Sequence, residues 1–319
     1  MSIPWNPGAP TTRTLARLLL LPLTLGACAG KADDTGAIDT GGSGGDDTAS
    51  ADGLRTLANC GGSIGSGVPE PFASWFDCVD IAVDGDNLLF QSVGLPPHKS
   101  PYYPEDDPNY EAFDTRTGDH YKNPNELSSQ VLTLSIPQNP TPKGITITAD
   151  MVNVSAGDST EEYHAEVQGM GLDGTNLFTG TAAPGDDISA EEYTFDLWEG
   201  HPQNSGVYHH HGANPSALAV LVDRGVATST TPGTNTVELF GLMCDGTVVI
   251  GCTELNGDSV SSAELDAQNG HVADVLGPDG SVFFAERYHV HACDALGRHL
   301  TPEIQYYDDG TCAGGGGPP

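Results

Sequence analysis

Two short segments of this 319-residue sequence place histidines at alternate positions behind a tyrosine. They are Tyr208-His209-His210-His211 and Tyr288-His289-Val290-His291. On a β-strand, side chains two residues apart leave the same face about 6.6–6.8 Å apart, so two imidazoles can converge on one ion. Imidazole suits transition metals, and we expect a single copper or zinc ion to be held by the spaced histidines of both segments. These four ligands are His209, His211, His289 and His291.

Other polar residues precede the two segments. His201 lies upstream of the first and His271 upstream of the second, and we expect both near the ion. Asp245 and Asp266 are second-rank candidates, because aspartate beside glycine or in a short connection is more often a turn residue than a ligand.

Two other interpretations stay open. With three protein ligands, an open coordination position could hold a metal-activated water, which would make the protein a metal-dependent hydrolase or oxidase. Alternatively, the tyrosine hydroxyls and imidazoles could satisfy one another in a structural or adhesion protein of the cell surface. The second alternative requires a stability that is indifferent to chelators.

The elements that must position these histidines are short and mostly extended. Eight segments rich in β-branched or aromatic residues predict strands at 79–83, 88–93, 131–136, 145–149, 163–167, 237–242, 248–250 and 282–285. A short helix is expected at 216–224, and we find no repeat of a solenoid period. The sequence therefore predicts a single large, mostly β, sandwich-like domain with long loops over residues 60–312.

The N-terminus predicts export. Arg13 and Arg17 precede an apolar run at 18–25, which is too short to span a bilayer, and small residues then lead to Cys28. This order is typical of a cleavable signal over residues 1–27. The junction resembles the lipobox of bacterial lipoproteins, which implies a lipid anchor on Cys28. We therefore expect a protein of the cell envelope, held to a membrane on its extracytoplasmic side.

The flanks of the domain are poor in apolar residues. Residues 28–59 are dominated by Gly, Asp, Thr, Ser and Ala, which predicts a disordered tether, and 313–319 predict a flexible tail. The formal net charge is −33, so the chain repels phosphate backbones and nucleic acid is excluded as a partner. The sequence does not identify a protein partner.

Six cysteines remain once Cys28 is assigned to the lipid, an even number that predicts three disulfides in an oxidising compartment. Sequence alone does not choose among the pairings. Proximity along the chain favours Cys60–Cys78, Cys244–Cys252 and Cys293–Cys312.

Six segments in order resemble the YHYH domain, a largely uncharacterised family of exported proteins named after a repeated Tyr-His-Tyr-His motif. They are the segments 93–98, 200–202, 206–211, 241–246, 265–271 and 288–291. The resemblance spans most of 94–307 and implies a probable site, but it does not imply a reaction. It adds His98 to the second-rank candidates.

The chain departs from the family pattern at two positions. His210 and Val290 replace the second tyrosine of each motif and leave the spaced histidines intact. Strand alternation predicts that these two residues face away from the site.

Overall fold

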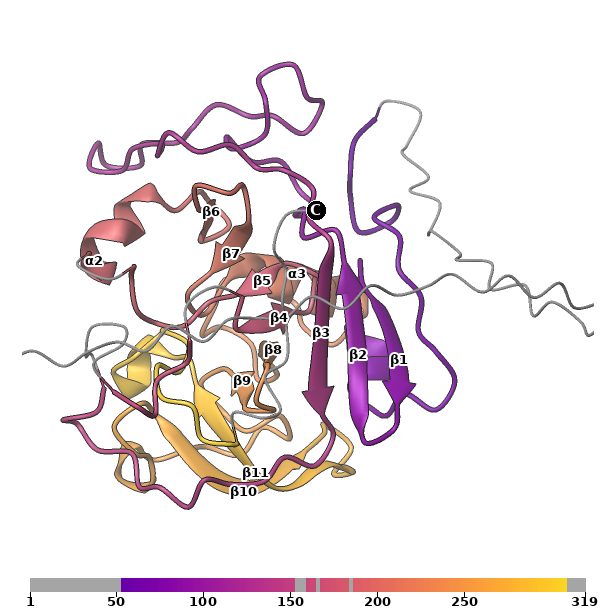
Figure 1. The fold of residues 1–319 in the computed structure, drawn as a ribbon, viewed down its shortest axis with the longest axis vertical. Helices are drawn as coiled ribbons and strands as arrows, with labels where there is room; N and C mark the ends of the chain where they lie inside the picture. The colour runs from indigo at the N-terminus through magenta and orange to yellow at the C-terminus, as the bar shows by residue number, and fades with distance from the viewer. Residues whose placement is uncertain (1–52, 153–158, 165–166, 184–185, 309–319) are drawn as a thin grey trace, which may run out of the picture. The chain divides into compact units, whose positions relative to one another are not determined.

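The computed structural model describes residues 53–308 apart from 153–158, 165–166 and 184–185 (Figure 1). The predicted mostly-β class and disulfide bracing are confirmed, and the strands form two sheets. The expected signal, Cys28, most of the tether and the tail lie outside the described residues. The described end of the predicted tether, residues 53–59, contacts the domain: the Arg55 amide donates to Asn109 Oδ1 at 2.9 Å. No helix in the described ranges is long and apolar enough to cross a bilayer.

A three-stranded antiparallel sheet comes first in the chain. Its strands are β1 (Asp80–Asp84), β2 (Asn87–Ser92) and β3 (Leu132–Pro137), in that order. Leu88 and Phe90 of the central strand are buried and alternate with more exposed neighbours, as expected for a sheet with one face on the core. This sheet belongs to the same hydrophobic core as the larger sheet described next.

The larger sheet has eight strands and two sequence-consecutive groups of four. The first group is β4 (Gly169–Gly171), β5 (Asn176–Leu177), β6 (Gly200–Pro202) and β7 (Tyr208–His210). The second group is β8 (Leu239–Met243), β9 (Val248–Ile250), β10 (Gly270–Leu276) and β11 (Val282–His291). The strands are ordered β10-β11-β9-β8-β4-β5-β7-β6, so the second group repeats the first in reverse across the sheet (Figure 1).

The pairing register shows that the two groups are structural repeats. In the first, β5 pairs in parallel with β7 and joins Asn176 to His209; in the second, β9 pairs in parallel with β11 and joins Val248 to His289. The outer hairpins match as well, with His201 opposite His209 and His271 opposite His289. We call the two groups the first half and the second half of the sheet.

The halves meet at an antiparallel pair of strands in the middle of the sheet. Here β4 pairs with β8, with Met170 opposite Leu242 and Gly171 opposite Gly241. In each half the next residues form the same turn, in which an aspartate accepts from the amide of a threonine two residues later. The turns are Asp173-Gly174-Thr175 and Asp245-Gly246-Thr247. This repeat is not apparent as a sequence period, because the loops that join the strands differ in length.

The helices are short. They are α1 (Phe72–Trp75), α2 (Ile188–Glu191), α3 (Pro215–Asp223) and the 3₁₀ turns η1 (Glu192–Thr194), η2 (Ser262–Glu264) and η3 (Asp294–Leu296). Asn214 caps α3 by accepting from the Ala217 amide, and Pro215 occupies the first turn, where its missing N–H costs nothing. The helix expected at 216–224 is thus confirmed, and it buries Leu218 and Leu221 in the core.

Most predicted strands are present, but two predicted segments form no strand. Strands occur at or next to the predicted 79–83, 88–93, 131–136, 237–242, 248–250 and 282–285. The segment 145–149 forms no strand, because its side chains are mostly exposed and no neighbouring strand pairs with it. The described part of 163–167 also forms no strand, whereas the short β4, β5 and β6 and the longer β10 were not expected.

One of the expected disulfides is confirmed and the other two are wrong. Cys60 and Cys78 are bonded, but Cys252 is bonded to Cys293. The parallel pairing of β9 with β11 sets Ile250 beside His291, so the cysteines two residues further along each chain also meet. Cys244 is also disulfide-bonded, and Cys312 lies outside the described residues.

Candidate metal centres

The same turn introduces the first histidine of each half. In the first half, Asp196 Oδ1 accepts from the amides of Trp198 at 2.8 Å and Gly200 at 3.3 Å. In the second half, Asp266 Oδ1 accepts from the amides two and four residues later, at 3.0 and 2.8 Å. The residue before each glycine has positive φ, 57° at Glu199 and 60° at Asn269. Each aspartate thus holds a tight turn that starts the strand bearing the histidine.

The tyrosines of the two motifs lock these turns in place. Tyr208 donates its hydroxyl to Asp196 at 2.9 Å, and Tyr288 donates its hydroxyl to Asp266 at 2.8 Å. Both rings are buried and lie against a glycine, Gly200 or Gly270, where an added Cβ would overlap the ring. Tyrosine, aspartate and glycine therefore form one support that sets the position of the spaced histidines.

The first histidine site consists of Glu191, His201, His209 and His211, whose ligand atoms all lie within 4.8 Å of one another. The Nε2 atom of His209 is 3.0 Å from Nε2 of His201 and 3.0 Å from Nε2 of His211. Glu191 Oε1 lies 3.4 Å from His201 Nε2. All three imidazoles are buried.

Hydrogen bonds at the other ring nitrogens fix the protonation of this site. His209 Nδ1 donates to the Val207 carbonyl at 3.0 Å, and His211 Nδ1 donates to the Thr179 carbonyl at 2.6 Å. His201 Nδ1 lies 2.6 Å from the Thr194 hydroxyl, which gives its own proton to a backbone carbonyl and must accept from the ring. In the neutral rings all three Nε2 atoms therefore carry lone pairs, and these lone pairs face one another.

Burial and neighbouring rings disfavour charge on these histidines. Desolvation lowers the pKa of His201 and of His209 well below the ordinary value, and it lowers the pKa of His211 to about 4. The Phe178 ring stacks on His209 with centroids 3.8 Å apart. Desolvation, aided by Asp186, raises the pKa of Glu191 to about 7. The first site thus holds three buried imidazoles in their neutral form.

The second histidine site consists of Glu254, His271, His289 and His291, again with all ligand atoms within 4.8 Å. His289 Nδ1 donates to the Arg287 carbonyl at 3.0 Å, and His291 Nδ1 donates to the Gly251 carbonyl at 2.8 Å. These bonds repeat those of the first half, so Nε2 of both rings again carries a lone pair. His291 Nε2 is 3.2 Å from His271 Nε2.

The carboxylate is the main difference at the second site. Glu254 Oε1 lies 3.0 Å from His271 Nε2 and 3.7 Å from His291 Nε2, and Oε2 lies 3.3 Å from His289 Nε2. Burial acts to raise the pKa of Glu254, but the proximity of His271 and His289 outweighs burial and holds the pKa below its usual value. Desolvation lowers the pKa of His291 to about 4.

The expectation of a single four-histidine site is therefore wrong about grouping. His209 and His211 join His201, whereas His289 and His291 join His271, because each hairpin carries its own third histidine directly opposite. His210 and Val290 are buried on the face away from the site, as alternation predicts, and His210 Nδ1 donates to the Glu199 carbonyl.

The second-rank candidates lie elsewhere. Asp266 supports its turn and Tyr288, while Asp245 Oδ2 accepts from the amides of Tyr306 and Tyr307. His98 stacks on Trp198 with ring centroids 4.2 Å apart and belongs to neither histidine site.

Sequence reasoning missed both carboxylates. Glu191 is the last residue of α2, and Glu254 lies in the loop after β9. Both lie in the connection between the second and third strands of their half. No local motif marks either residue, and the number of residues between the carboxylate and the next histidine of its site, His201 or His271, differs between the two halves.

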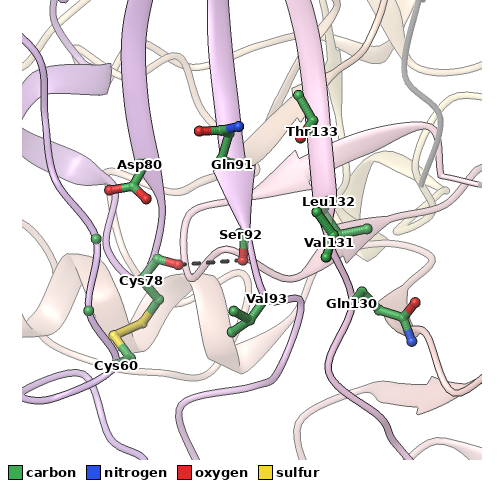
Figure 2. Close-up of a pocket in the computed structure, with 12 residues that line it drawn as sticks. Cys60, Cys78, Asp80, Gln91, Ser92, Val93, Gln130, Val131, Leu132 and Thr133 are labelled. Carbon is green, nitrogen blue, oxygen red and sulfur yellow. Dashed lines mark hydrogen bonds between the residues drawn. A yellow bond between two sulfur atoms is a disulfide. The ribbon is translucent and has the colours of Figure 1, made fainter. Parts of the chain in front are cut away.

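A third cluster of potential metal ligands, formed by two cysteines and an aspartate, is not a metal site. Cys60, Asp77 and Cys78 lie close together. The two cysteines are joined in a disulfide, which Figure 2 shows, so neither offers a thiolate. The adjacent hollow, of about 190 Å³, is lined by this disulfide and by β2 and β3 residues such as Gln91 and Thr133.

Comparison with known proteins gives one match. Residues 123–265 match the model of the YHYH protein family, which is somewhat less than half of the chain. The match includes the first histidine site and Glu254 and ends before His271. Searches of the curated proteins and of the solved structures gave no match. Over residues 123–265, the resemblance to the YHYH family inferred from the motifs is thereby confirmed.

Proposed function

We propose that this protein binds two transition-metal ions, copper or zinc, one at each histidine site. The observation that carries the proposal is the convergence of imidazole lone pairs. At the first site none of the three Nε2 atoms carries a proton, and Nε2 of His209 lies 3.0 Å from Nε2 of His201 and 3.0 Å from Nε2 of His211. Their lone pairs repel one another unless a cation lies among them. One shared proton could join only two of the three nitrogens.

The donor set suits the proposed ions. Three imidazoles and one carboxylate oxygen make a mixed nitrogen and oxygen site that fits zinc and copper, and the order of divalent affinities favours copper. Most of the ring Nδ1 atoms donate to backbone carbonyls, which is the outer support that metal-ligating histidines commonly have.

The surroundings support a cation at these sites. The net charge of −33 gives the molecule an anionic field that attracts cations. At the second site the carboxylate of Glu254 approaches two fixed lone pairs, on His289 and His291, and a divalent ion would compensate all of them at once.

We further propose that the protein works outside the cytoplasm as a lipoprotein anchored through Cys28. The support is the sequence order of basic residues, an apolar run and a small-residue junction. Disulfides such as Cys252–Cys293 fit an oxidising compartment. Metabolic labelling with a palmitate analogue tests the anchor, since Cys28→Ala should abolish the label.

Metal content is the decisive measurement. The full chain, purified without a histidine tag and incubated with Cu(II) or Zn(II), should retain two ions per chain by elemental mass spectrometry. His209→Ala with His211→Ala should remove one ion, and His289→Ala with His291→Ala should remove the other. A wild-type protein that retains neither metal would contradict the proposal and favour a structural histidine network.

A metal-dependent hydrolase or oxidase is the second candidate. It is favoured by one observation, a cavity of about 260 Å³ whose wall includes Glu191 and His201 of the first site. A metal-activated water beside such a cavity would have room for a substrate. Hydrolysis of a model ester that disappears with the first-site ion alone would support this candidate.

A further inference from the structure

The two carboxylates are held in different ways. Glu254 lies two residues after Cys252, whose disulfide to Cys293 ties its loop to the chain two residues beyond His291. The next residue, Leu255, is fully buried. Glu254 is therefore fixed over its three imidazoles from both sides, and its oxygens approach each ring within 3.7 Å.

Glu191 has much less support. It is the last residue of α2, a four-residue helix with no buried residue. Its oxygen pairs with one imidazole, that of His201, and its side chain is 25% exposed, against 14% for Glu254. This carboxylate can therefore move without breaking a tertiary contact of its helix.

The face of the first site that Glu191 covers opens into the cavity of about 260 Å³. Its wall also contains Thr194, which supports His201, and Tyr121, Asn123 and Ala190. A water molecule occupies roughly 30 Å³ of liquid, so the cavity has room for a molecule of several heavy atoms beside the ion.

We propose that the ion at the first site binds a small neutral ligand, with a nitrogen or oxygen lone pair, that enters from this cavity. The ligand takes the coordination position that the Glu191 carboxylate covers. The ion at the second site binds no such ligand. The inference rests on the proposed function, since it assumes a metal ion at both sites. It assigns ligand exchange to the first site and a closed, structural ion to the second.

The charge of the wall selects neutral ligands. Asp186 and Asp187 line the cavity together with Glu191. An anion entering beside these carboxylates would be repelled, whereas a neutral azole or amine would not. Imidazole and azide are therefore suitable probes, because both bind Cu(II) but imidazole is neutral and azide is an anion.

The experiment uses the full chain loaded with Cu(II) and one histidine site removed at a time. In the variant with His289→Ala and His291→Ala, imidazole at pH 8 should shift the visible absorption and the electron paramagnetic resonance of the copper. In the variant with His209→Ala and His211→Ala, the same additions should leave both spectra unchanged. Azide should perturb the first site at least about tenfold more weakly than imidazole does.

Filling the cavity provides a second test. Ala190→Leu should raise the apparent Kd for imidazole on the order of tenfold, while copper stays at one ion in the variant that keeps only the first site. Ala263→Leu, at an exposed alanine of the matching connection in the second half, is the control and should change nothing.

Two results would overturn the inference: equal spectral responses at the two sites, or release of copper by imidazole without a ternary complex. Absence of copper from the wild-type protein is a different result, because it would remove the proposed function itself.

Discussion

The two histidine sites lie on corresponding strands and have the same tyrosine and aspartate supports and the same tautomers at the two histidines of each motif, yet they differ in their carboxylates. The first site has Glu191 on an exposed turn of helix beside a cavity; the second has Glu254 on a loop tied down by a disulfide. The sheet thus fixes the positions of the three imidazoles at each site, whereas the loops between strands determine how exposed each site is. These loops differ between the two halves in length and in chemistry.

Breaking the Cys252–Cys293 disulfide should separate the sites most strongly. Replacing both cysteines with alanine removes the tie that holds Glu254, so we expect on the order of 10–100-fold weaker metal affinity at the second site and no change at the first. Stability should fall by about 2–5 kcal/mol. Chelator competition on each single-site variant measures this, with Cys60→Ala and Cys78→Ala as the control that should spare the second site.

Because tyrosine, aspartate and glycine support both sites in the same way, replacing the corresponding glycines should lower the free energy of unfolding equally. Gly200→Ala and Gly270→Ala each place a Cβ against a buried tyrosine ring, so each should cost about 1–3 kcal/mol of unfolding free energy. Urea unfolding of the metal-free protein measures both. A cost at only one glycine would show that the two turns are not equivalent.

Acid should destabilise the metal-free protein, and the first site should contribute most. Burial lowers the pKa of His201, His209 and His211, so below about pH 6.5 the unfolded chain binds protons that the folded site refuses. Each such histidine reduces stability by up to about 1.4 kcal/mol per pH unit as pH falls.

Urea midpoints between pH 7 and pH 5 measure this slope. His211→Leu should flatten it, because leucine has no proton to bind in either state. A slope that is unchanged in this variant would place the acid sensitivity elsewhere in the chain.

The carboxylates themselves should give the smallest contrast. Glu254→Gln removes a charge that approaches three rings and should weaken copper binding at the second site about tenfold, or about 1.4 kcal/mol. Glu191→Gln should weaken binding at the first site less, by about threefold at most. Equal losses at the two sites would argue against a loosely held Glu191. Isothermal titration on the single-site variants compares them.

The sequence predicts local features of the sites well and long-range features poorly. Alternate histidines on a strand face the same way regardless of the rest of the fold, so His209 with His211 and His289 with His291 could be paired in advance. Which histidines come together depends on strand order, because the parallel neighbours β5 and β9 lie between the two hairpins in the sheet.

The errors have the same origin. Nearness along the chain suggested Cys244–Cys252 and Cys293–Cys312, but the pairing of β9 with β11 brings Cys252 to Cys293. Segment 145–149 has β-branched residues but no partner strand, and propensity without pairing does not make a strand. Glu191 and Glu254 come from loops, whose paths follow no short pattern.

The central pairing of β4 with β8 has a consequence for the origin of the fold. Equivalent residues face each other there, Met170 opposite Leu242, so the contact has the geometry of an isologous dimer interface contained within a single chain. A half produced alone would expose the inner edge of its sheet and would need a second copy to cover it. Because both halves lie in one chain, their loops need not be identical, and Glu191 and Glu254 approach their histidines from loops of different structure.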